Sequence, residues 1–261
     1  MIEPIERADD PRISAYAHIG DHVWLREHGL FVAEGRLVVR RLLASGQFPV
    51  HSILLTPAAL ESFGGAIAAD APVYVASIDV LQQVTGFNFH RGCLALASRP
   101  SGESSGRPFL DSPLLLAMEG VSNPDNVGGL FRVAAAFGVN GVLLDPASGD
   151  PFYRKAVRTS MGTVLSVPFG RLAAWPSVLD DYRGKGFTLV AMTPRADAEP
   201  IDQVAAGIGR PVIVMVGAEG PGLTEAAMAL ADVRARIPIA STVDSLNVVV
   251  AAGIALAYLS R

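Results

Sequence analysis

The pattern of apolar and polar positions changes several times along the first part of the chain. In residues 29–46, Phe31, Val38 and Leu42 fall near helical spacing and Gly46 follows them, which predicts a helix. Short apolar runs then predict strands at 52–55, 73–76 and 92–98, with helices at 57–68 and 78–84 between them. This alternation indicates a small α/β domain.

A second alternating series begins near residue 113. It predicts strands at 114–118, 142–144, 165–168, 188–192 and 212–216, and helices at 127–137, 153–161, 175–183, 224–231 and 245–259. Apolar strands that alternate with helices indicate a parallel sheet covered on both faces. Ligands in such folds bind outside the carboxyl ends of the strands. The loops that follow these strands are therefore the first place to look for a site.

A linker separates the two series. The stretch "SRPSGESSGRPFLDSP" at 98–113 is rich in serine, glycine and proline and has no apolar periodicity. We therefore divide the chain into a domain at 1–100, a linker at 101–112 and a second domain at 113–261.

Composition and cysteine content narrow the class of protein. Half of the residues are hydrophobic and 18% are charged, which predicts a folded core. The N-terminal stretch is charged and broken by Pro11, unlike a signal peptide. The longest apolar run, 246–259, is shorter than the ~18 residues of a membrane span. Cys93 is the single cysteine, which excludes an internal disulfide and a cysteine-built zinc site. We expect a cytoplasmic protein.

The charge does not suggest a general nucleic-acid binder. The net charge is −4, whereas such proteins usually carry a basic face. Lys155 and Lys185 are the only lysines, so nearly all positive charge is arginine. Arginine matches phosphate geometry, but a coding bias toward GC-rich codons gives the same excess and is the simpler interpretation.

The first loop of interest follows the strand at 114–118 and reads "MEGVSNPDNVGGLFRVAAAFG". Asn126 is expected to cap the helix, and Val127, Leu130 and Phe131 form its apolar stripe. Arg132 lies off that stripe, and a solvated surface arginine is the simpler interpretation of its place. The segment "NVGG" does not match the GxGxxG pattern of dinucleotide-binding proteins.

Two further loops follow strand ends. In "VMVGAEGPGLTEAAM", Gly217 and Gly222 flank Glu219, and such glycines let a backbone approach a ligand, although a plain turn explains them equally well. In "IPIASTVDSLN", Asp244 or Ser245 is expected to cap the last helix. Asn247 would then lie in the first turn of a helix that is apolar all round, where a buried amide needs hydrogen-bond partners.

Together the three loops resemble, in order, the three motifs of the SpoU (TrmH) family of RNA ribose 2′-O-methyltransferases, of the SPOUT class. The matching stretches are "NPDNVGGLFRVAAAFG", "VGAEGPGL" and "IPIASTVDSLNVVVAAGIALA". A fourth, "YRKAVRTSMGTVLSVP", resembles the family's arginine–serine–glycine segment. "GLFVAEGRLVVRRLL" and "FHRGCLALASRP" resemble the substrate-binding domain often fused to these enzymes. The resemblance covers most of the chain past Gly29. In the third motif, Val249 stands where the family often has a small polar residue, and we interpret this position as one of packing.

The resemblance implies an α/β SPOUT methyltransferase domain with a trefoil knot, a rare exception to ordinary connectivity, preceded by a smaller α/β RNA substrate-binding domain. It implies a pocket for S-adenosylmethionine formed by the second and third motifs. The cofactor-binding residues would be Thr193, Gly217, Gly222, Ile237, Ile239 and Leu246. It also implies a homodimer with the last helix in the interface. No metal is expected.

The resemblance gives Arg132 the central catalytic role, with Asn126, Glu219, Ser245 and Asn247 positioning it and the ribose. Because guanidinium has a pKa above ~12, an electrostatic role suits Arg132 better than that of a base, and the choice stays open. The resemblance extends to Arg158, which could reach the site from its own subunit or a partner. RNA contacts are expected at Arg36, Arg40, Arg41, Arg91 and Arg158, although a solvated helix face explains the first three equally well.

Other functions stay open at this point. A protein could keep the fold and bind RNA, or assist ribosome assembly, without catalysis, although the complete set of motif residues argues against this. An ordinary Rossmann-type nucleotide enzyme lacks its glycine fingerprint here. A knotted enzyme could also methylate a base instead of a ribose. The sequence does not indicate which RNA or nucleotide is modified, nor whether the role is housekeeping or antibiotic resistance.

Overall fold

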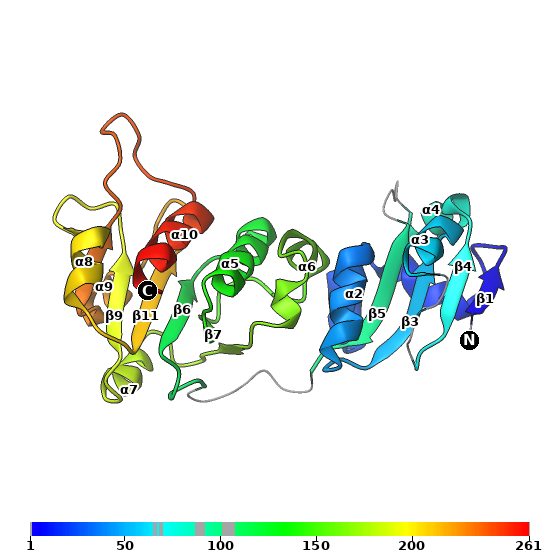
Figure 1. The fold of residues 1–261 in the computed structure, drawn as a ribbon, viewed down its shortest axis with the longest axis horizontal. Helices are drawn as coiled ribbons and strands as arrows, with labels where there is room; N and C mark the ends of the chain where they lie inside the picture. Colours follow the sequence, from blue (N-terminus) through cyan, green and yellow to red (C-terminus); the bar gives the residue numbers. More distant parts are fainter. Residues whose placement is uncertain (1, 65–66, 68–69, 87–91, 101–107, 261) are drawn as a thin grey trace. The chain divides into compact units, whose positions relative to one another are not determined.

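The computed structural model describes residues 2–64, 67, 70–86, 92–100 and 108–260 (Figure 1). The chain forms two compact units. Unit 1 comprises Met1–Ser101 together with Pro151–Leu165, and unit 2 comprises Gly102–Asp150 and Ser166–Arg261. In the described part, no helix is long and apolar enough to cross a membrane.

Unit 1 contains a mixed sheet with strand order β1-β4-β3-β5-β2. Its strands are β1 (Ile2–Ile5), β2 (Leu30–Glu34), β3 (Val50–Leu55), β4 (Val73–Ala76) and β5 (Cys93–Ser98). β1 and β3 run parallel to β4, whereas β5 runs antiparallel to both β3 and β2. The α/β expectation for this region is confirmed, with antiparallel pairing as an addition.

The helix predicted over 29–46 is wrong in its first part, because Leu30–Glu34 is strand β2. Phe31, Val32 and Ala33 are fully buried and pair with β5, so both faces of this run are covered. Gly35, with φ of 94°, then separates the strand from α2 (Arg36–Ser45). L side chains rarely adopt that conformation, which explains the break.

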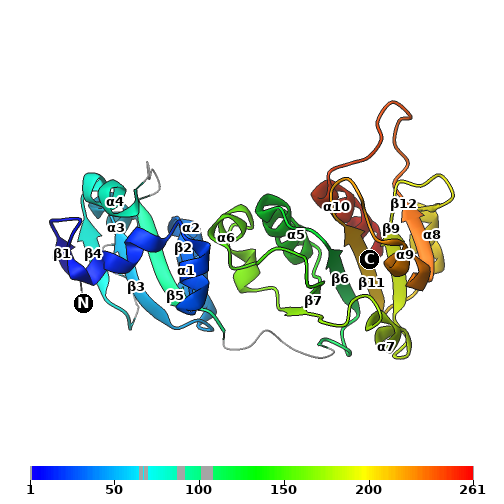
Figure 2. The same cartoon turned by 180° about the vertical axis from the view of Figure 1, so that it is seen from behind.

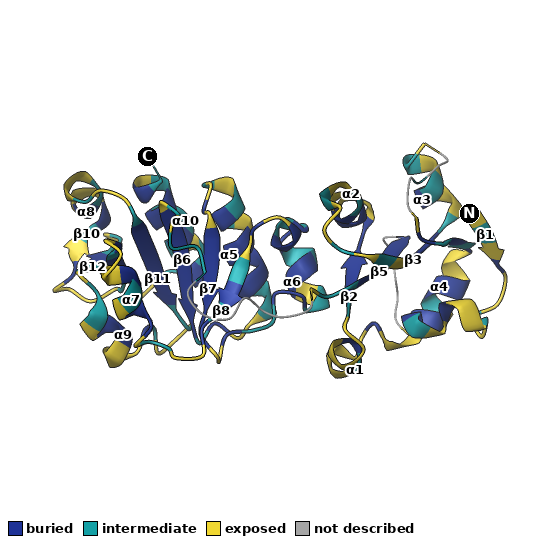
Figure 3. Cartoon of the chain, turned by 90° about the horizontal axis from the view of Figure 1, so that it is seen from below, coloured by how far each residue is buried: buried dark blue, intermediate teal, exposed yellow. Residues whose placement is uncertain are grey.

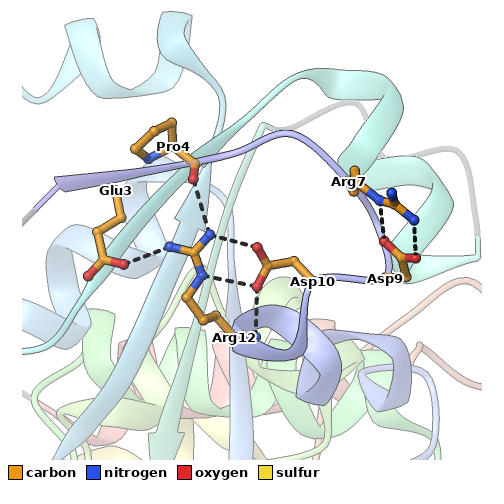
Figure 4. Close-up of polar contacts among 6 residues, drawn as sticks. All are labelled: Glu3, Pro4, Arg7, Asp9, Asp10 and Arg12. Atoms are coloured by element: carbon orange, nitrogen blue, oxygen red, sulfur yellow. Dashed lines mark hydrogen bonds and ion pairs between the residues drawn. The ribbon is translucent and has the colours of Figure 1, made fainter.

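Short helices cover the sheet of unit 1. They are η1 (Pro11–His18), α1 (His22–Glu27), α3 (Pro57–Ser62) and α4 (Ile78–Thr85), in addition to α2. Ile13, Tyr16 and Leu81 pack with the strands in one core cluster. Arg12 ties η1 to β1 by donating to Glu3 (2.8 Å) and to both carboxylate oxygens of Asp10, which lowers the pKa of Asp10 (Figure 4).

The segment Pro151–Leu165 belongs to unit 1, although the sequence placed it in the second domain. It contains α6 (Arg154–Thr159) and η2 (Thr163–Leu165), and α6 packs against β2. Arg154 and Arg158 form ion pairs of 3.4 and 3.6 Å with the buried carboxylate of Glu34. A buried charge needs such partners, and their separation in sequence explains why local patterns did not reveal them.

The sheet of unit 2 is parallel throughout its described strands, which confirms the predicted parallel arrangement. The strand order is β10-β12-β9-β11-β6-β7-β8. The strands are β6 (Leu114–Glu119), β7 (Gly141–Leu144), β8 (Phe169–Arg171), β9 (Thr188–Met192), β10 (Glu199–Pro200), β11 (Val212–Gly217) and β12 (Val233–Arg236). Because all run the same way, their carboxyl ends meet at one edge of the sheet.

Helices cover both faces of this sheet, and the central strands β6, β7 and β11 between them are buried (Figure 3). α5 (Pro124–Ala136) and α10 (Val248–Leu259) lie side by side in Figures 1 and 2. α7 (Leu179–Arg183) and α9 (Glu225–Leu230) contribute to a core cluster with β6, β9 and β11. α8 (Ile201–Gly207) packs against α10 and β12.

Two element predictions in this unit need correction, and β10, α8 and β12 were not predicted at all. The predicted strand at 165–168 is absent from that position, and β8 follows it. The helix predicted at 175–183 is regular only in α7, consistent with Pro176, which restricts the residue before it. β12 was not predicted as a strand, because its sequence "VRAR" carries too few apolar residues to give a strand signal.

Candidate functional site

A cavity of about 360 Å³ lies at the carboxyl ends of β9, β11 and β12, entirely within unit 2. The lining residues come from the loops that follow these strands and from the start of α10. They are Met192, Thr193, Pro194, Val216, Gly217, Ala218, Glu219, Gly220, Gly222, Ile237, Ile239, Ser245, Leu246, Asn247, Val248 and Ala251. The position agrees with the general location of ligand sites in parallel α/β sheets.

One wall of the cavity is the loop that continues β11. It folds back on itself, because Gly222 N–H donates to Ala218 O at 3.0 Å. A Cβ atom on Gly217 would overlap the backbone of Gly222 and Leu223, so only glycine fits there. Gly220 and Gly222 have φ of 89° and 72°. The loop therefore brings backbone, without intervening side chains, to the wall of the cavity.

The opposite wall is the segment between β12 and α10. The structure corrects the predicted cap of α10: the helix begins at Val248, and Asn247 is the N-cap. Asn247 Oδ1 accepts a hydrogen bond of 2.9 Å from Val249 N–H. Asp244 and Ser245 therefore lie before the helix, in the loop, and both are exposed.

The remaining end of the Asn247 amide connects three elements. Asn247 Nδ2 donates to Glu219 Oε1 at 2.8 Å and to Asn126 Oδ1 at 3.1 Å. The prediction that Asn126 caps α5 is wrong, because Asn123 accepts from Asp125 N–H at 2.9 Å in that role. Asn126 lies in the first turn of α5, buried, and its carbonyl faces Asn247. The two asparagines and Glu219 thus form one hydrogen-bonded group at the cavity.

Arg132 lies apart from this group. It is exposed on α5 and makes no hydrogen bond or ion pair with any residue that the structure describes. It is not among the lining residues of the cavity, whereas Ser245 is. The structure therefore places four of the five expected catalytic residues at or beside the cavity. Arg132 shares a helix with Asn126 and keeps its guanidinium available to a molecule from solution.

All six expected cofactor-binding residues, Thr193, Gly217, Gly222, Ile237, Ile239 and Leu246, line the cavity. Met192, Pro194, Ala218, Val248 and Ala251, among others, also line the cavity and were not predicted. Met192 and Pro194 flank the end of β9, so the strand-end rule could have found them. Val248 and Ala251 lie in the first turn of α10, and the predicted helix began three residues too early.

The expected RNA contacts of the described chain lie in unit 1, where α2 exposes Arg36, Arg40 and Arg41. Arg36 and Arg40 line a second cavity, of about 510 Å³. Arg40 also donates to Ser62 O, and its Cζ atom lies 5.0 Å from the centre of the Phe63 ring.

Two other arginines of unit 1 are occupied by contacts within it. Arg41 donates to Met161 O at 2.7 Å, and Arg158 pairs with Glu34. Arg91 lies outside the described residues. Among the described residues, no group of three or more His, Cys, Asp or Glu side chains could hold a metal ion.

Comparison with known proteins places these features in context. The model of the SpoU rRNA methylase family matches residues 113–257, which include every residue lining the first cavity. An uncharacterised tRNA/rRNA methyltransferase of Mycobacterium tuberculosis is 42% identical over 234 residues, covering 89% of this chain and 80% of the relative.

Solved structures agree with these matches. A crystal structure of an RNA 2′-O-ribose methyltransferase has a TM-score of 0.80 at 28% identity, covering 98% of this chain and 97% of that one. The crystal structure of the AdoMet-bound rRNA methyltransferase of Sinorhizobium meliloti also has a TM-score of 0.80, at 24% identity. The match covers 99% of this chain and 97% of that one. This last similarity shows the fold.

Proposed function

Because the chain belongs to the SpoU rRNA methylase family, we propose that it transfers a methyl group from S-adenosylmethionine to a ribose 2′-hydroxyl of rRNA or tRNA. One observation carries the proposal: Asn126, Glu219 and Asn247, from three separate segments, meet beside a cavity walled by glycine backbone. The similarity to an RNA 2′-O-ribose methyltransferase at 28% identity supports ribose as the acceptor.

The cavity suits S-adenosylmethionine in size and in chemistry. Its volume of about 360 Å³ falls in the ~300–1,000 Å³ range of small-molecule sites. Ile237, Ile239 and Leu246 offer apolar contact, and Gly222, beside which a Cβ would meet no atom within 4 Å, leaves space next to the backbone. Thr193 adds a hydroxyl. When bound, the cofactor supplies a methyl group that its sulfonium has already activated.

The polar group beside the cavity positions the acceptor. Asn247 holds Oε1 of Glu219, while Oε2 has no hydrogen-bond partner among the described residues and accepts from a ribose hydroxyl. Asn126 fixes the Asn247 amide in this orientation. Ser245, exposed at the rim, contributes a further hydroxyl. Positioning of this kind supplies much of the rate in a displacement between two bound groups.

Arg132 acts on the substrate electrostatically. Its guanidinium keeps its proton near neutral pH, so it holds an RNA phosphate and stabilises negative charge that develops on the ribose oxygen. The freedom of Arg132 from contacts with described residues supports this role, because no internal partner competes with the phosphate. The hydroxyl proton passes to a phosphate oxygen or to water.

Unit 1 binds the RNA. Arg36, Arg40 and Arg41 present positive charge on one helix of this unit, and Arg91 and Arg158 extend the same contact set. Phosphate contacts of this kind release counterions and give affinities that fall with salt. The rRNA or tRNA substrate places the activity in the cytoplasm.

The finer features of the fold also belong to this proposal. The segment between β12 and α10 passes through a trefoil knot, and two copies of the chain associate through α10. The outer side of α10 supports this association, since Val250 and Tyr258 are 50% and 42% exposed. An association through α10 would remove these two apolar side chains from water.

The proposal is tested by incubating the purified protein with methyl-labelled S-adenosylmethionine and separate pools of unmodified rRNA and tRNA. We expect label in one of the pools and none without protein. Saturable RNA binding without transfer to either pool would instead favour the catalytically silent RNA-binding protein.

A further inference from the structure

The carboxylate of Glu119 is buried at the carboxyl end of β6 and has hydrogen-bond donors on each oxygen. Only 6% of the residue is exposed. Trp175 Nε1 donates to Oε1 at 2.7 Å, and Thr224 donates to Oε1 through its hydroxyl (2.8 Å) and to Oε2 through its N–H (2.7 Å). Burial of a carboxylate is costly unless it is satisfied in this way.

These contacts fix both ends of the loop that forms one wall of the cavity. Gly217, where the loop begins, is the register partner of Glu119 in the sheet. Thr224, where the loop ends, is the N-cap of α9, and its hydroxyl accepts from Ala227 N–H at 3.2 Å. Since that hydroxyl accepts from the helix, its hydrogen is committed to Glu119.

The shape of the loop depends on the distance between those two ends. Gly222 crosses Gly217 so closely that no Cβ fits between them, and Glu219 reaches Asn247 from the tip of the same loop. A shift of Thr224 would therefore displace the glycine wall, whereas the hydrogen bond from Asn247 holds Glu219 from outside the loop.

We propose that Glu119 is a positioning residue that clamps this loop in the shape that binds the cofactor. It lies outside the cavity lining and acts through Thr224, so it sets the affinity for S-adenosylmethionine and not the methyl-transfer step itself. The inference rests on the proposed function.

The test is Glu119→Gln, which keeps the size of the side chain. Its amide nitrogen would face Thr224 N–H, donor against donor, if its oxygen keeps Trp175 and the Thr224 hydroxyl. We expect the Kd and the KM for S-adenosylmethionine to rise about tenfold, with kcat within about threefold of the wild type. An unchanged Kd would overturn the inference.

Tyr182→Phe is the matched control for a general loss of stability. It removes a hydrogen bond of 2.9 Å to Pro108 O in the same unit, next to the segment where Phe109 packs on Gly141 at the start of β7. We expect a lower Tm with no change in cofactor Kd. An equal rise of Kd in both variants would show a merely structural role for Glu119 and overturn the inference.

Trp175→Phe is a second, milder variant that tests the inference if Glu119→Gln does not fold. It removes one donor and leaves both contacts with Thr224, so we expect the Kd to rise about threefold. No change in that variant would contradict the clamp. A wild-type protein that does not bind S-adenosylmethionine would overturn the proposed function itself, and this outcome is distinct from all of those above.

Discussion

The two ends of the Asn247 amide serve different purposes. The oxygen caps α10 by accepting from Val249 N–H, and the nitrogen donates to Asn126 and Glu219. A substitution at Asn247 can therefore separate helix stability from catalysis. Capping needs a hydrogen-bond acceptor, whereas the contacts with Asn126 and Glu219 need a donor.

Asn247→Asp separates them. Aspartate caps helices as well as asparagine, so we expect Asn247→Asp to keep the capping contribution to stability that Asn247→Ala loses. Its second carboxylate oxygen would face Glu219, and like charges at that distance repel, so methyl transfer should fall by about a hundredfold or more. Asn247→Ala should lose both activity and about 1 kcal/mol of stability. Thermal melts and initial rates measure the two effects, and full activity in Asn247→Asp would rule out the donor role.

Arg132→Ala should abolish methyl transfer and leave cofactor binding intact. Since Arg132 contacts no described residue by hydrogen bond or ion pair, we expect stability within about 0.5 kcal/mol of the wild type. Calorimetric titration with S-adenosylmethionine and transfer assays on RNA check this. Arg132→Lys is the control for charge without the planar fork. Near-normal turnover in the alanine variant would exclude the assigned role.

Cys93 is buried, and burial raises the pKa of its thiol from 9.0 to about 12. The thiolate is the reactive form, so Cys93 should resist thiol reagents at pH 8 until the protein is denatured. The folded state keeps the proton between pH 9 and 12 while the unfolded state releases it, so this residue lowers stability as pH rises through that window. Rapid labelling of the native protein would contradict the prediction.

At the scale of elements, the contact between α5 and α10 brings Asn126 and Asn247 together. A Cβ on Gly129 of α5 would lie 2.7 Å from a methyl carbon of Val249 on α10. Val249 thus occupies the space above Gly129, and the packing role expected for Val249 follows from this contact. Val249 is bulkier than the small polar residue often found at this motif position, and the absence of a side chain on Gly129 gives it the space that it needs.

Gly129→Ala should therefore destabilise the protein by about 1–3 kcal/mol through overpacking. Val249→Ala alone leaves a gap, but the double variant should lose less stability than the sum of the two single changes, because each relieves the other. Denaturant unfolding of all four proteins measures this coupling. Additive losses would show that the two residues do not press on each other.

The sequence revealed these elements unevenly. The central strands of unit 2, β6, β7, β9 and β11, were predictable because their apolar runs are buried on both faces. Leu30–Glu34 was mistaken for helix because its apolar residues also continue the spacing of α2, and only Gly35 marks the break. The cap of α10 was placed too early because Asp244, Ser245 and Asn247 are all good caps, and tertiary partners selected the last one.

At the scale of the whole molecule, the family and several residues that line the cavity were predictable from the motifs, whereas the geometry of the cavity was not. The resemblance to the SpoU family is confirmed by the family match, and all six residues expected at the cofactor line one cavity. The assignment of Pro151–Leu165 to unit 1 could not be read from the sequence. It shows in contacts between residues far apart in the sequence, such as the ion pairs of Glu34 with Arg154 and Arg158.

The most direct test of the central claim is the identity of the methylated nucleoside. RNA methylated by the protein is digested to nucleosides and analysed by mass spectrometry, with Asn247→Asp as the inactive control. We predict one nucleoside that carries its new methyl group on the ribose 2′-oxygen. A methyl group on a base, or no methylated nucleoside from either rRNA or tRNA, would contradict the account.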